Sequence, residues 1–287
     1  MLQRITISGF LFCISSFGLA GCATQSAAPG SLAVPEAPAA ADLPAAVAEP
    51  DLGVLWVRDA AEYRALSLQA YAAAAKDLDA MINDEFWSAL PEQANAAGLE
   101  PAIIFDVDET LVTNVRFQIE HMPPFRNSKL DDWNAANKAT GVPGAAEFVR
   151  LARDSGVAVF FVTNRPCEPK DEVTDPCPQE AVTVGDLNEA GIPADAESVM
   201  MANEQPEWTR EKEGRRDLIA KNFRVIMLVG DDLGDFIACV RARALEPCTE
   251  PATKASRARD TDRYSMYWGN GWYVLPNPMH GSWTTAQ

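Results

Sequence analysis

Four short apolar runs, separated by segments of helical pattern, constrain the fold of this chain more than any other feature. The runs cover residues 102–105, 157–162, 198–201 and 225–229. They are continuously apolar, which is typical of strands buried on both faces of a sheet. Helices are predicted over residues 58–82, from 143 onward, over 179–190 and over 210–222. This alternation predicts an α/β fold with a doubly wound parallel sheet.

Polar side chains follow three of these runs, at the point where each predicted strand ends. They are Asp106 and Asp108, then Thr163 and Asn164, and then Asp231, Asp232 and Asp235. Each cluster alone could cap a helix, since Asp, Asn and Thr are good N-cap residues. Ligands of open α/β sheets bind beyond the carboxyl ends of the strands, so three equivalent clusters favour one shared site.

The N-terminus has the pattern of a bacterial lipoprotein signal. Arg4 precedes a short apolar stretch over 5–17, and Leu-Ala-Gly-Cys ends at Cys22. A transmembrane anchor is the alternative, but the apolar stretch is shorter than the roughly 20 residues that a span needs. We therefore expect a signal peptide over 1–21 and a lipid anchor on Cys22 that holds the chain on a membrane.

An Ala- and Pro-rich segment over 22–50 is expected to be a flexible tether, because its composition cannot support a packed core. A single folded domain is then expected over 51–287.

Export would place the remaining cysteines in an oxidising compartment. Of six cysteines, Cys13 would leave with the signal peptide and Cys22 would be lipidated, so four remain. Four cysteines allow three pairings. The short local loops favour two of the possible disulfides, Cys167–Cys177 and Cys239–Cys248.

The charge and the histidine content narrow the function. The formal net charge is −17, and no segment is dense in Lys and Arg, so a nucleic-acid polymer is not an expected partner. The two histidines, His121 and His280, argue against a polyhistidine zinc site. A small substrate is expected instead.

Four ordered motifs give the chain a resemblance to a known superfamily. Residues 103–110 (IIFDVDET), 161–165 (FVTNR), Lys212 with the following arginines, and 228–236 (LVGDDLGDF) resemble the four motifs of the haloacid dehalogenase (HAD) superfamily. Trp133, residues 142–148 and residues 274–283 make the chain most similar to the class C acid phosphatases. These are bacterial outer-membrane lipoproteins that act on 5′-nucleotides. The resemblance implies a HAD-like core with a small, mainly helical cap, here over about 112–142.

The resemblance also implies a role for each motif residue. Asp106, Asp108, Thr163 and Lys212 would be catalytic, with Asp106 the nucleophile and Asp108 the general acid and base. Mg²⁺ would be held by the Asp106 and Asp231 carboxylates and by the Asp108 carbonyl oxygen. Asp232 and Asp235 would orient their neighbours.

Four further residues are expected to contact the substrate: Asn164, Arg165, Trp133 and His280. Trp133 either stacks on a base or packs between cap and core. His280 stands where the family usually has an aromatic residue, which suggests a weaker preference for nucleotides. Residues 248–262 form a polar insertion without an assigned role.

The function expected from the sequence is that of a phosphomonoesterase acting on 5′-nucleotides or similar small phosphate esters. The alternatives are a phosphatase for non-nucleotide esters and a surface-binding lipoprotein without catalysis. The expected location is the cell envelope, on the outer membrane.

Overall fold

The computed structural model describes residues 51–122, 124–171 and 173–286. The expected signal peptide, lipid anchor on Cys22 and tether lie outside these residues. No helix within the described ranges is both long and apolar enough to cross a membrane.

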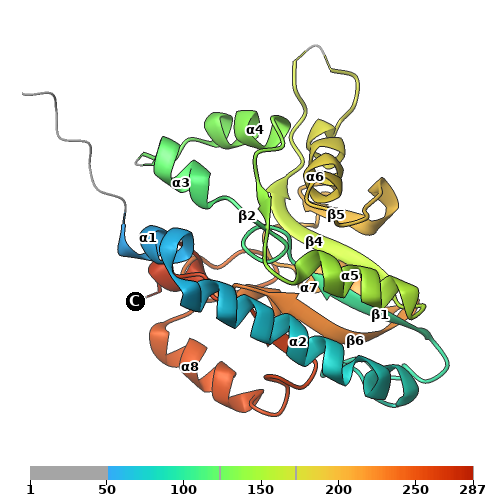
Figure 1. Cartoon of the computed structure of the whole chain (residues 1–287). Coiled ribbons are helices and arrows are strands. Elements are labelled where there is room, and N and C mark those ends of the chain that lie inside the picture. The colour runs from blue at the N-terminus through green and yellow to red at the C-terminus, as the bar shows by residue number, and fades with distance from the viewer. Residues whose placement is uncertain (1–50, 123, 172, 287) are drawn as a thin grey trace, which may run out of the picture. The chain divides into compact units, whose positions relative to one another are not determined.

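The centre of the fold is a five-stranded parallel sheet with the order β5-β4-β1-β6-β7 (Figure 1). The strands are β1 (Glu100–Phe105), β4 (Ala158–Pro166), β5 (Val199–Ala202), β6 (Phe223–Gly230) and β7 (Trp272–Val274). The first four coincide with the four apolar runs. The prediction of an α/β fold with a parallel sheet is therefore confirmed.

Alternate residues of β1 enter two apolar clusters on opposite faces of the sheet. Ile103 and Phe105 pack with α2 (Ala61–Asn83) and α5 (Ala145–Asp154). Ala102 and Ile104 pack with Ile219 of α7 (Glu213–Ala220) on the other face. Because both faces are covered, β1 is apolar from Pro101 to Phe105, and the next polar side chain, Asp106, follows the strand end.

The cap consists of a two-stranded ribbon and two helices inserted between β1 and α5. The ribbon pairs β2 (Val112–Thr113) with β3 (Thr140–Gly141), and the helices are α3 (Val115–His121) and α4 (Asn127–Ala135). Figure 1 shows both helices, in green, outside the layer formed by α2 and α5. Helix α4 contacts α6 (Pro178–Glu189) of the core domain.

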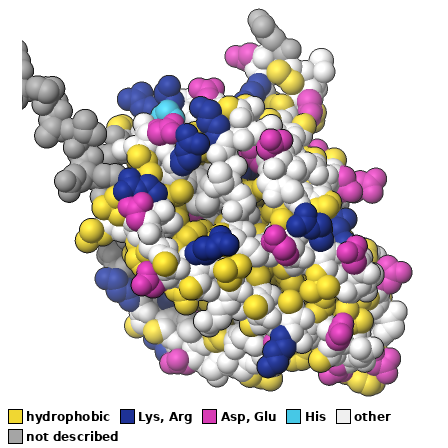
Figure 2. Space-filling model, in the orientation of Figure 1, with side chains coloured by type: hydrophobic (Ala, Val, Ile, Leu, Met, Phe, Trp, Pro, Cys, Tyr) yellow, Lys and Arg dark blue, Asp and Glu magenta, His cyan; other side chains and the backbone are white. Residues whose placement is uncertain are grey.

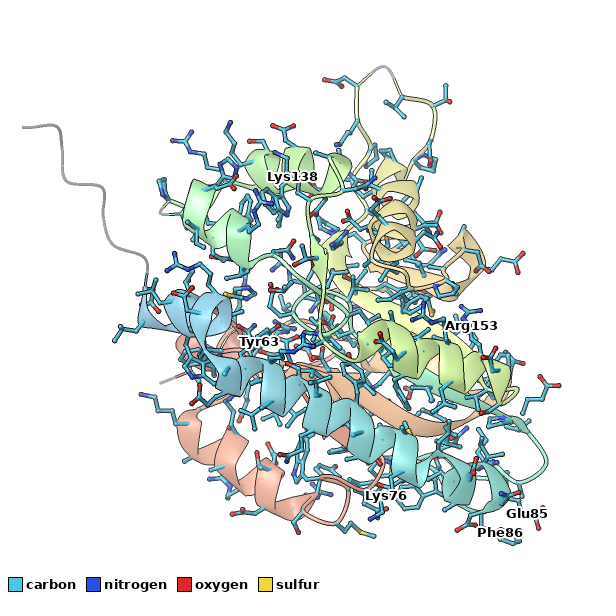
Figure 3. All side chains as sticks on the ribbon, viewed as in Figure 1. Tyr63, Lys76, Glu85, Phe86, Lys138 and Arg153 are labelled. Atoms are coloured by element: carbon cyan, nitrogen blue, oxygen red, sulfur yellow. A yellow bond between two sulfur atoms is a disulfide. The ribbon has the colours of Figure 1, made fainter. Side chains whose placement is uncertain are left out.

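Two local predictions differ from the structure. The helix expected over 58–82 is broken at Ala60, which is extended, so that α1 (Leu52–Asp59) is separate from α2. Val54 and Val57 of α1 pack against Tyr63 in a small cluster of their own, and Tyr63 lies beside α1 in Figure 3. Helix α7 begins at Glu213 rather than at residue 210, because Lys212 immediately before it is turned into the site.

The unassigned insertion over 248–262 includes all but the last residue of α8 (Lys254–Arg263), which is N-capped by Thr253. Both expected disulfides, Cys167–Cys177 and Cys239–Cys248, are present. On the face shown in Figure 2, acidic and basic side chains are interspersed.

A buried arginine donates hydrogen bonds to the carbonyl groups at the C-terminal end of α2. Arg224 of β6 is 3% exposed and donates to the carbonyl oxygens of Met81 and Asp84 through Nη1, each at 2.8 Å, and to that of Ile82 through Nη2 at 2.8 Å. The last carbonyl groups of a helix have no partner within it, and a cation there also interacts favourably with the helix dipole. Arg224 therefore ties the long helix to the central sheet.

We expect Arg224→Met to destabilise the domain by about 2–3 kcal/mol, because buried carbonyl groups lose their donors. Thermal unfolding should show a decrease in Tm of roughly 5–10 °C. Arg58→Met is the control, since Arg58 is exposed and its ion-pair partner Asp59 is exposed as well, so this change should leave Tm nearly unchanged. Equal Tm values for the two variants would contradict this assignment.

Candidate active site

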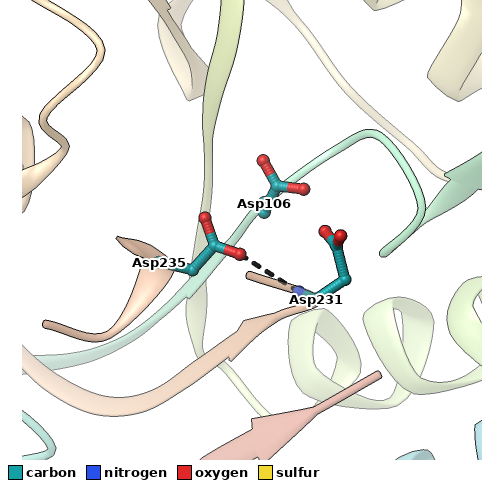
Figure 4. A group of neighbouring side chains, drawn as sticks. All are labelled: Asp106, Asp231 and Asp235. Atoms are coloured by element: carbon teal, nitrogen blue, oxygen red, sulfur yellow. Dashed lines mark hydrogen bonds between the residues drawn. The ribbon is translucent and has the colours of Figure 1, made fainter. Parts of the chain in front are cut away.

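Three carboxylates meet at the carboxyl edge of the sheet. Asp106 follows β1, Asp231 follows β6, and Asp235 ends the short helix η2 (Leu233–Asp235). One oxygen from each lies within 4.8 Å of the others (Figure 4). Asp106 and Asp235 are buried, so this cluster of like charges requires compensation from nearby groups.

Neutral donors hold two of these carboxylates in place. The Thr110 hydroxyl lies 3.1 Å from oxygens of both Asp106 and Asp231, and the Asn277 amide donates to Asp231 at 2.7 Å. A Cβ on Gly230 would lie 2.3 Å from the Asp235 carboxylate, so glycine is required directly before Asp231. The loop after β6 is therefore shaped around the cluster.

Lys212 supplies the positive charge. Its ammonium group bonds to Asp106 Oδ1 and lies 2.7 Å from Asp235 Oδ1, with the side chain 3% exposed. Burial lowers the pKa of Lys212, but the two carboxylates outweigh burial and raise it. The lysine therefore remains charged beside the nucleophile candidate.

One lysine does not neutralise the whole cluster. Burial, with the charges of Asp235 and Asp108, raises the pKa of Asp106 to about 6 despite Lys212. Burial and the neighbouring Asp106 raise the pKa of Asp231 well above its ordinary value. Such shifts indicate a site with a deficit of positive charge.

The residues present fit a divalent cation. The ligand atoms that Asp106 and Asp231 offer to a metal ion are carboxylate oxygens, which suit a hard cation such as Mg²⁺. Asp235 is less available, because its Oδ2 accepts from the backbone N–H groups of Asp231 and Asp232 at 3.0 and 2.9 Å and its Oδ1 faces Lys212.

Asp108 lies at the same edge and is paired with Arg165. The Arg165 Nε lies 3.0 Å from Asp108 Oδ2, its Nη2 lies 2.8 Å from Oδ1, and Asn114 Nδ2 donates to Oδ1 at 2.7 Å. Burial raises the pKa of Asp108, but Arg165 and Asn114 more than offset it, so the pKa is lowered. Asp108 therefore has defined partners on two sides.

A cavity of about 770 Å³ opens above these residues. Asp106, Asp108, Lys212, Asp231 and His280 all line it. The cap contributes an apolar wall, made of Phe117, Met122, Phe125 and Leu130. The volume suits a ligand of a few tens of atoms.

Of the four residues expected to contact the substrate, three line the cavity and one does not. Asn164, Arg165 and His280 line the cavity, and His280 Nε2 lies 3.2 Å from the buried Glu109 carboxylate. Burial lowers the pKa of His280, yet Glu109 outweighs burial and raises it. Trp133 is 2% exposed and is not among the lining residues. Its geometry fits the packing alternative rather than the stacking one.

Thr163 is fully buried, and its hydroxyl accepts from the Arg165 backbone N–H at 3.1 Å. Asn164 Oδ1 accepts from Arg215 at 3.3 Å, which fixes the turn after β4. Asp232 accepts from Gly234 and from Ser282, so it joins the C-terminal segment to the loop after β6. Both expected orienting residues, Asp232 and Asp235, thus bond to backbone groups of this loop.

Several site residues were not singled out from the sequence. Thr110 and Asn277 lie inside quoted motifs, and their polar side chains beside apolar neighbours were an available signal. Glu109 and Asn114 follow Asp108 closely, and Glu109 has a positive φ of 60°. Asp186 of α6, which accepts from Arg165 at 2.6 Å, has no local signal.

We expect Mg²⁺ to stabilise the protein more as the pH rises through about 6. Asp106 has a raised pKa in the folded state, so its contribution to stability is present below pH ~4 and is lost as the pH rises through about 6. A cation binds the ionised carboxylates and reverses this loss. At 100 times its Kd it adds about 2.7 kcal/mol.

Thermal unfolding with and without Mg²⁺ at pH 5 and pH 7.5 measures this effect. The increase in Tm should be small at pH 5 and roughly 5–10 °C at pH 7.5. Asp231→Asn should abolish the increase. A shift in Tm that does not depend on pH would count against a cation at these carboxylates.

Comparison with known proteins agrees with this geometry. Residues 54–283 match the family model described as HAD superfamily, subfamily IIIB (Acid phosphatase). Two solved structures of the class C acid phosphatase from Bacillus anthracis are similar in fold. The structure with tungstate bound has a TM-score of 0.65 and 24% identity, and the other has a TM-score of 0.64 and 25% identity. Each alignment covers 82% of this chain and 86% of that one.

The HAD-like fold expected from the four motifs is confirmed by these structures. Because the family model spans most of the sequence, the chain belongs to the acid phosphatases of HAD superfamily subfamily IIIB.

Proposed function

We propose that this acid phosphatase hydrolyses 5′-nucleotides or similar small phosphate esters, with Mg²⁺, through an aspartyl-phosphate on Asp106. The observation that carries the proposal is the position of Asp106. Its carboxylate lies at the cavity wall, bonded to the buried ammonium group of Lys212, with Asp108 lining the same cavity.

In the first step an oxygen of Asp106 attacks the phosphorus atom. The bond from phosphorus to the ester oxygen breaks, and that oxygen takes the proton of Asp108 and leaves as an alcohol. Lys212 offsets the repulsion between the carboxylate and the phosphate, which for unit charges about 4 Å apart is roughly 4 kcal/mol at an effective dielectric of 20.

In the second step water attacks the phosphorus atom of the aspartyl-phosphate. Asp108 takes a proton from the water, the bond from phosphorus to the Asp106 oxygen breaks, and inorganic phosphate leaves. Asp106 returns as a carboxylate and Asp108 as an acid. Mg²⁺, held by Asp106, Asp231 and the Asp108 carbonyl oxygen, would neutralise charge on the phosphoryl group.

The apolar cap wall supports an aromatic substrate. Phe125 is half exposed and lines the cavity from the cap with Met122 and Leu130, and an aromatic side chain stacks on a base with about 1–3 kcal/mol. A phosphate ester without a ring is the alternative, since His280 stands where an aromatic residue is usual in the family. Rates on a nucleotide and on a sugar phosphate separate the two.

We also propose that the protein is exported and held on the outer membrane through acyl chains on Cys22. The support is the sequence Leu-Ala-Gly-Cys after a short apolar stretch. Metabolic labelling with a radioactive fatty acid, compared with Cys22→Ser, tests this.

The first assay is phosphate release from a nucleoside 5′-monophosphate with Mg²⁺, with and without EDTA. EDTA should abolish release. The acid form of Asp108, whose pKa Arg165 lowers, becomes more populated as the pH falls, whereas Asp106, with a pKa of about 6, must be ionised to attack and to bind the metal. We therefore expect kcat/KM to increase from pH 8 to about pH 6 and to decrease below it. Release that EDTA does not affect would contradict the metal requirement.

Asp106→Asn should lower kcat by about 10⁴-fold or more, since it removes the nucleophile. The variant should still bind an oxyanion, because the asparagine amide is uncharged and does not repel an anion, and because Lys212 remains. Tungstate, which is bound in the Bacillus anthracis structure, is a suitable probe, and it should still raise Tm. Full activity in this variant would overturn the assignment of the nucleophile.

A further inference from the structure

The Asp108 carboxylate is held by two side chains that come from different parts of the fold. Arg165, at the end of β4, lies 2.8 and 3.0 Å from its two oxygens. Asn114, which precedes cap helix α3, donates to Oδ1 at 2.7 Å. One partner therefore belongs to the core domain and the other to the cap.

Each of these partners is fixed by a buried side chain that does not line the cavity. Asp186 of α6 accepts from Arg165 Nη1 at 2.6 Å, and its side chain is fully buried. Trp133 of α4 donates its indole N–H to Asn114 Oδ1 at 3.1 Å, and it is 2% exposed. Neither residue has access to the substrate.

The indole determines how the Asn114 amide faces. The Trp133 Nε1–H is a donor only, so it requires the amide oxygen of Asn114 on its side. The amide nitrogen must then face Asp108, where it can donate to a carboxylate. Without the indole, the amide could present its oxygen to Asp108, and that contact would be repulsive.

Asp186 has a similar effect on Arg165. Its buried carboxylate, with the Thr183 hydroxyl, accepts from Nη1, the guanidinium nitrogen that does not bond to Asp108. Nε and Nη2 are then directed at Asp108 as a fork. A buried carboxylate costs desolvation energy, and packing alone does not require one on α6.

We propose that Asp186 and Trp133 are positioning residues for the acid–base step, which hold the Asp108 carboxyl group beside the leaving oxygen. Asp186 acts through Arg165, and Trp133 acts through Asn114. The inference rests on the proposed function, in which Asp108 protonates that oxygen. Trp133 then connects the cap to the chemistry by its indole N–H rather than by stacking on a base.

The nature of the leaving group distinguishes this role from simple structural support. An alkoxide leaves only with a proton, whereas 4-nitrophenolate is a stable anion and leaves without one. A displaced acid should therefore slow phosphoryl transfer from an alkyl phosphate and have little effect on an aryl phosphate. A loss of folded protein lowers both rates by the same factor.

The experiment compares kcat/KM for 4-nitrophenyl phosphate and for an alkyl phosphate, because kcat/KM reports the step in which the ester bond breaks. In Asp186→Asn and in Trp133→Phe, the value for the alkyl ester should fall about 10- to 100-fold. The value for the aryl ester should change by less than about threefold.

Trp272→Phe is the matched control. Trp272 is also buried and also donates its indole N–H, to the Ala89 carbonyl oxygen at 2.6 Å, but it is not among the residues that line the active cavity. Its ratio of aryl to alkyl kcat/KM should equal that of the wild type.

Equal losses on the two esters, or no loss on either, in Trp133→Phe would overturn the proposal. This variant keeps a buried aromatic ring, so it decides the question if Asp186→Asn does not fold. Failure of the wild-type protein to hydrolyse any monoester would refute the proposed function itself, which is a distinct result.

Discussion

The arrangement of this active site depends on the cost of burying several carboxylates beside one another. Asp106 and Asp235 are buried, Asp231 lies next to them, and Lys212 is shared between the first two. One ammonium group cannot neutralise three carboxylates, so the remaining negative charge favours the binding of a divalent cation. A cation bound there would also reduce the repulsion that an incoming phosphate meets. The proposed binding of a metal and of a phosphate ester would thus both follow from the same deficit of positive charge.

Two side chains, Asp235 and Arg216, hold the backbone of the loop after β6. Asp235 accepts from two backbone N–H groups of the loop, and the buried Arg216 donates to the carbonyl oxygens of Gly234 and Asp235 at 3.3 and 2.9 Å. Arg216 belongs to α7, which begins directly after Lys212. The lysine and the loop that it faces are therefore fixed relative to each other by a single helix, so little reorganisation is needed when charge moves during catalysis.

Much of the fold was predictable because its main signals are local. The four apolar runs predicted β1, β4, β5 and β6, and the acids that follow these runs include all three residues of the carboxylate cluster. Strand β7 has only three residues, too few for a pattern to identify, and it is defined by pairing with β6. The break at Ala60 depends on how α1 packs, which is a tertiary effect.

The parts of the site that could not be predicted depend on contacts between distant segments. Asp186 lies within an ordinary helical pattern, and only the approach of α6 to the end of β4 brings it to Arg165. Whether Trp133 is buried or exposed to the cavity depends on how α3 and α4 pack. Arg165 is charged whether it is buried or exposed, so the sequence does not indicate which of the two it is. Its ion pairs with Asp108 and Asp186 depend on how the chain folds.

The contacts made by Asn277 and Ser282 have a consequence for how the protein reaches its native state. These residues bond to Asp231 and Asp232 across 46 and 50 positions of sequence, and the catalytic edge also needs Asp106 from far earlier in the chain. A nascent polypeptide that stops before Asn277 already contains all the acids but lacks these contacts. Asp231 and Asp232 therefore gain these side-chain partners only when the segment that carries Asn277 and Ser282 is in place. The C-terminal segment is therefore part of the catalytic edge, although it carries none of the carboxylates of that edge.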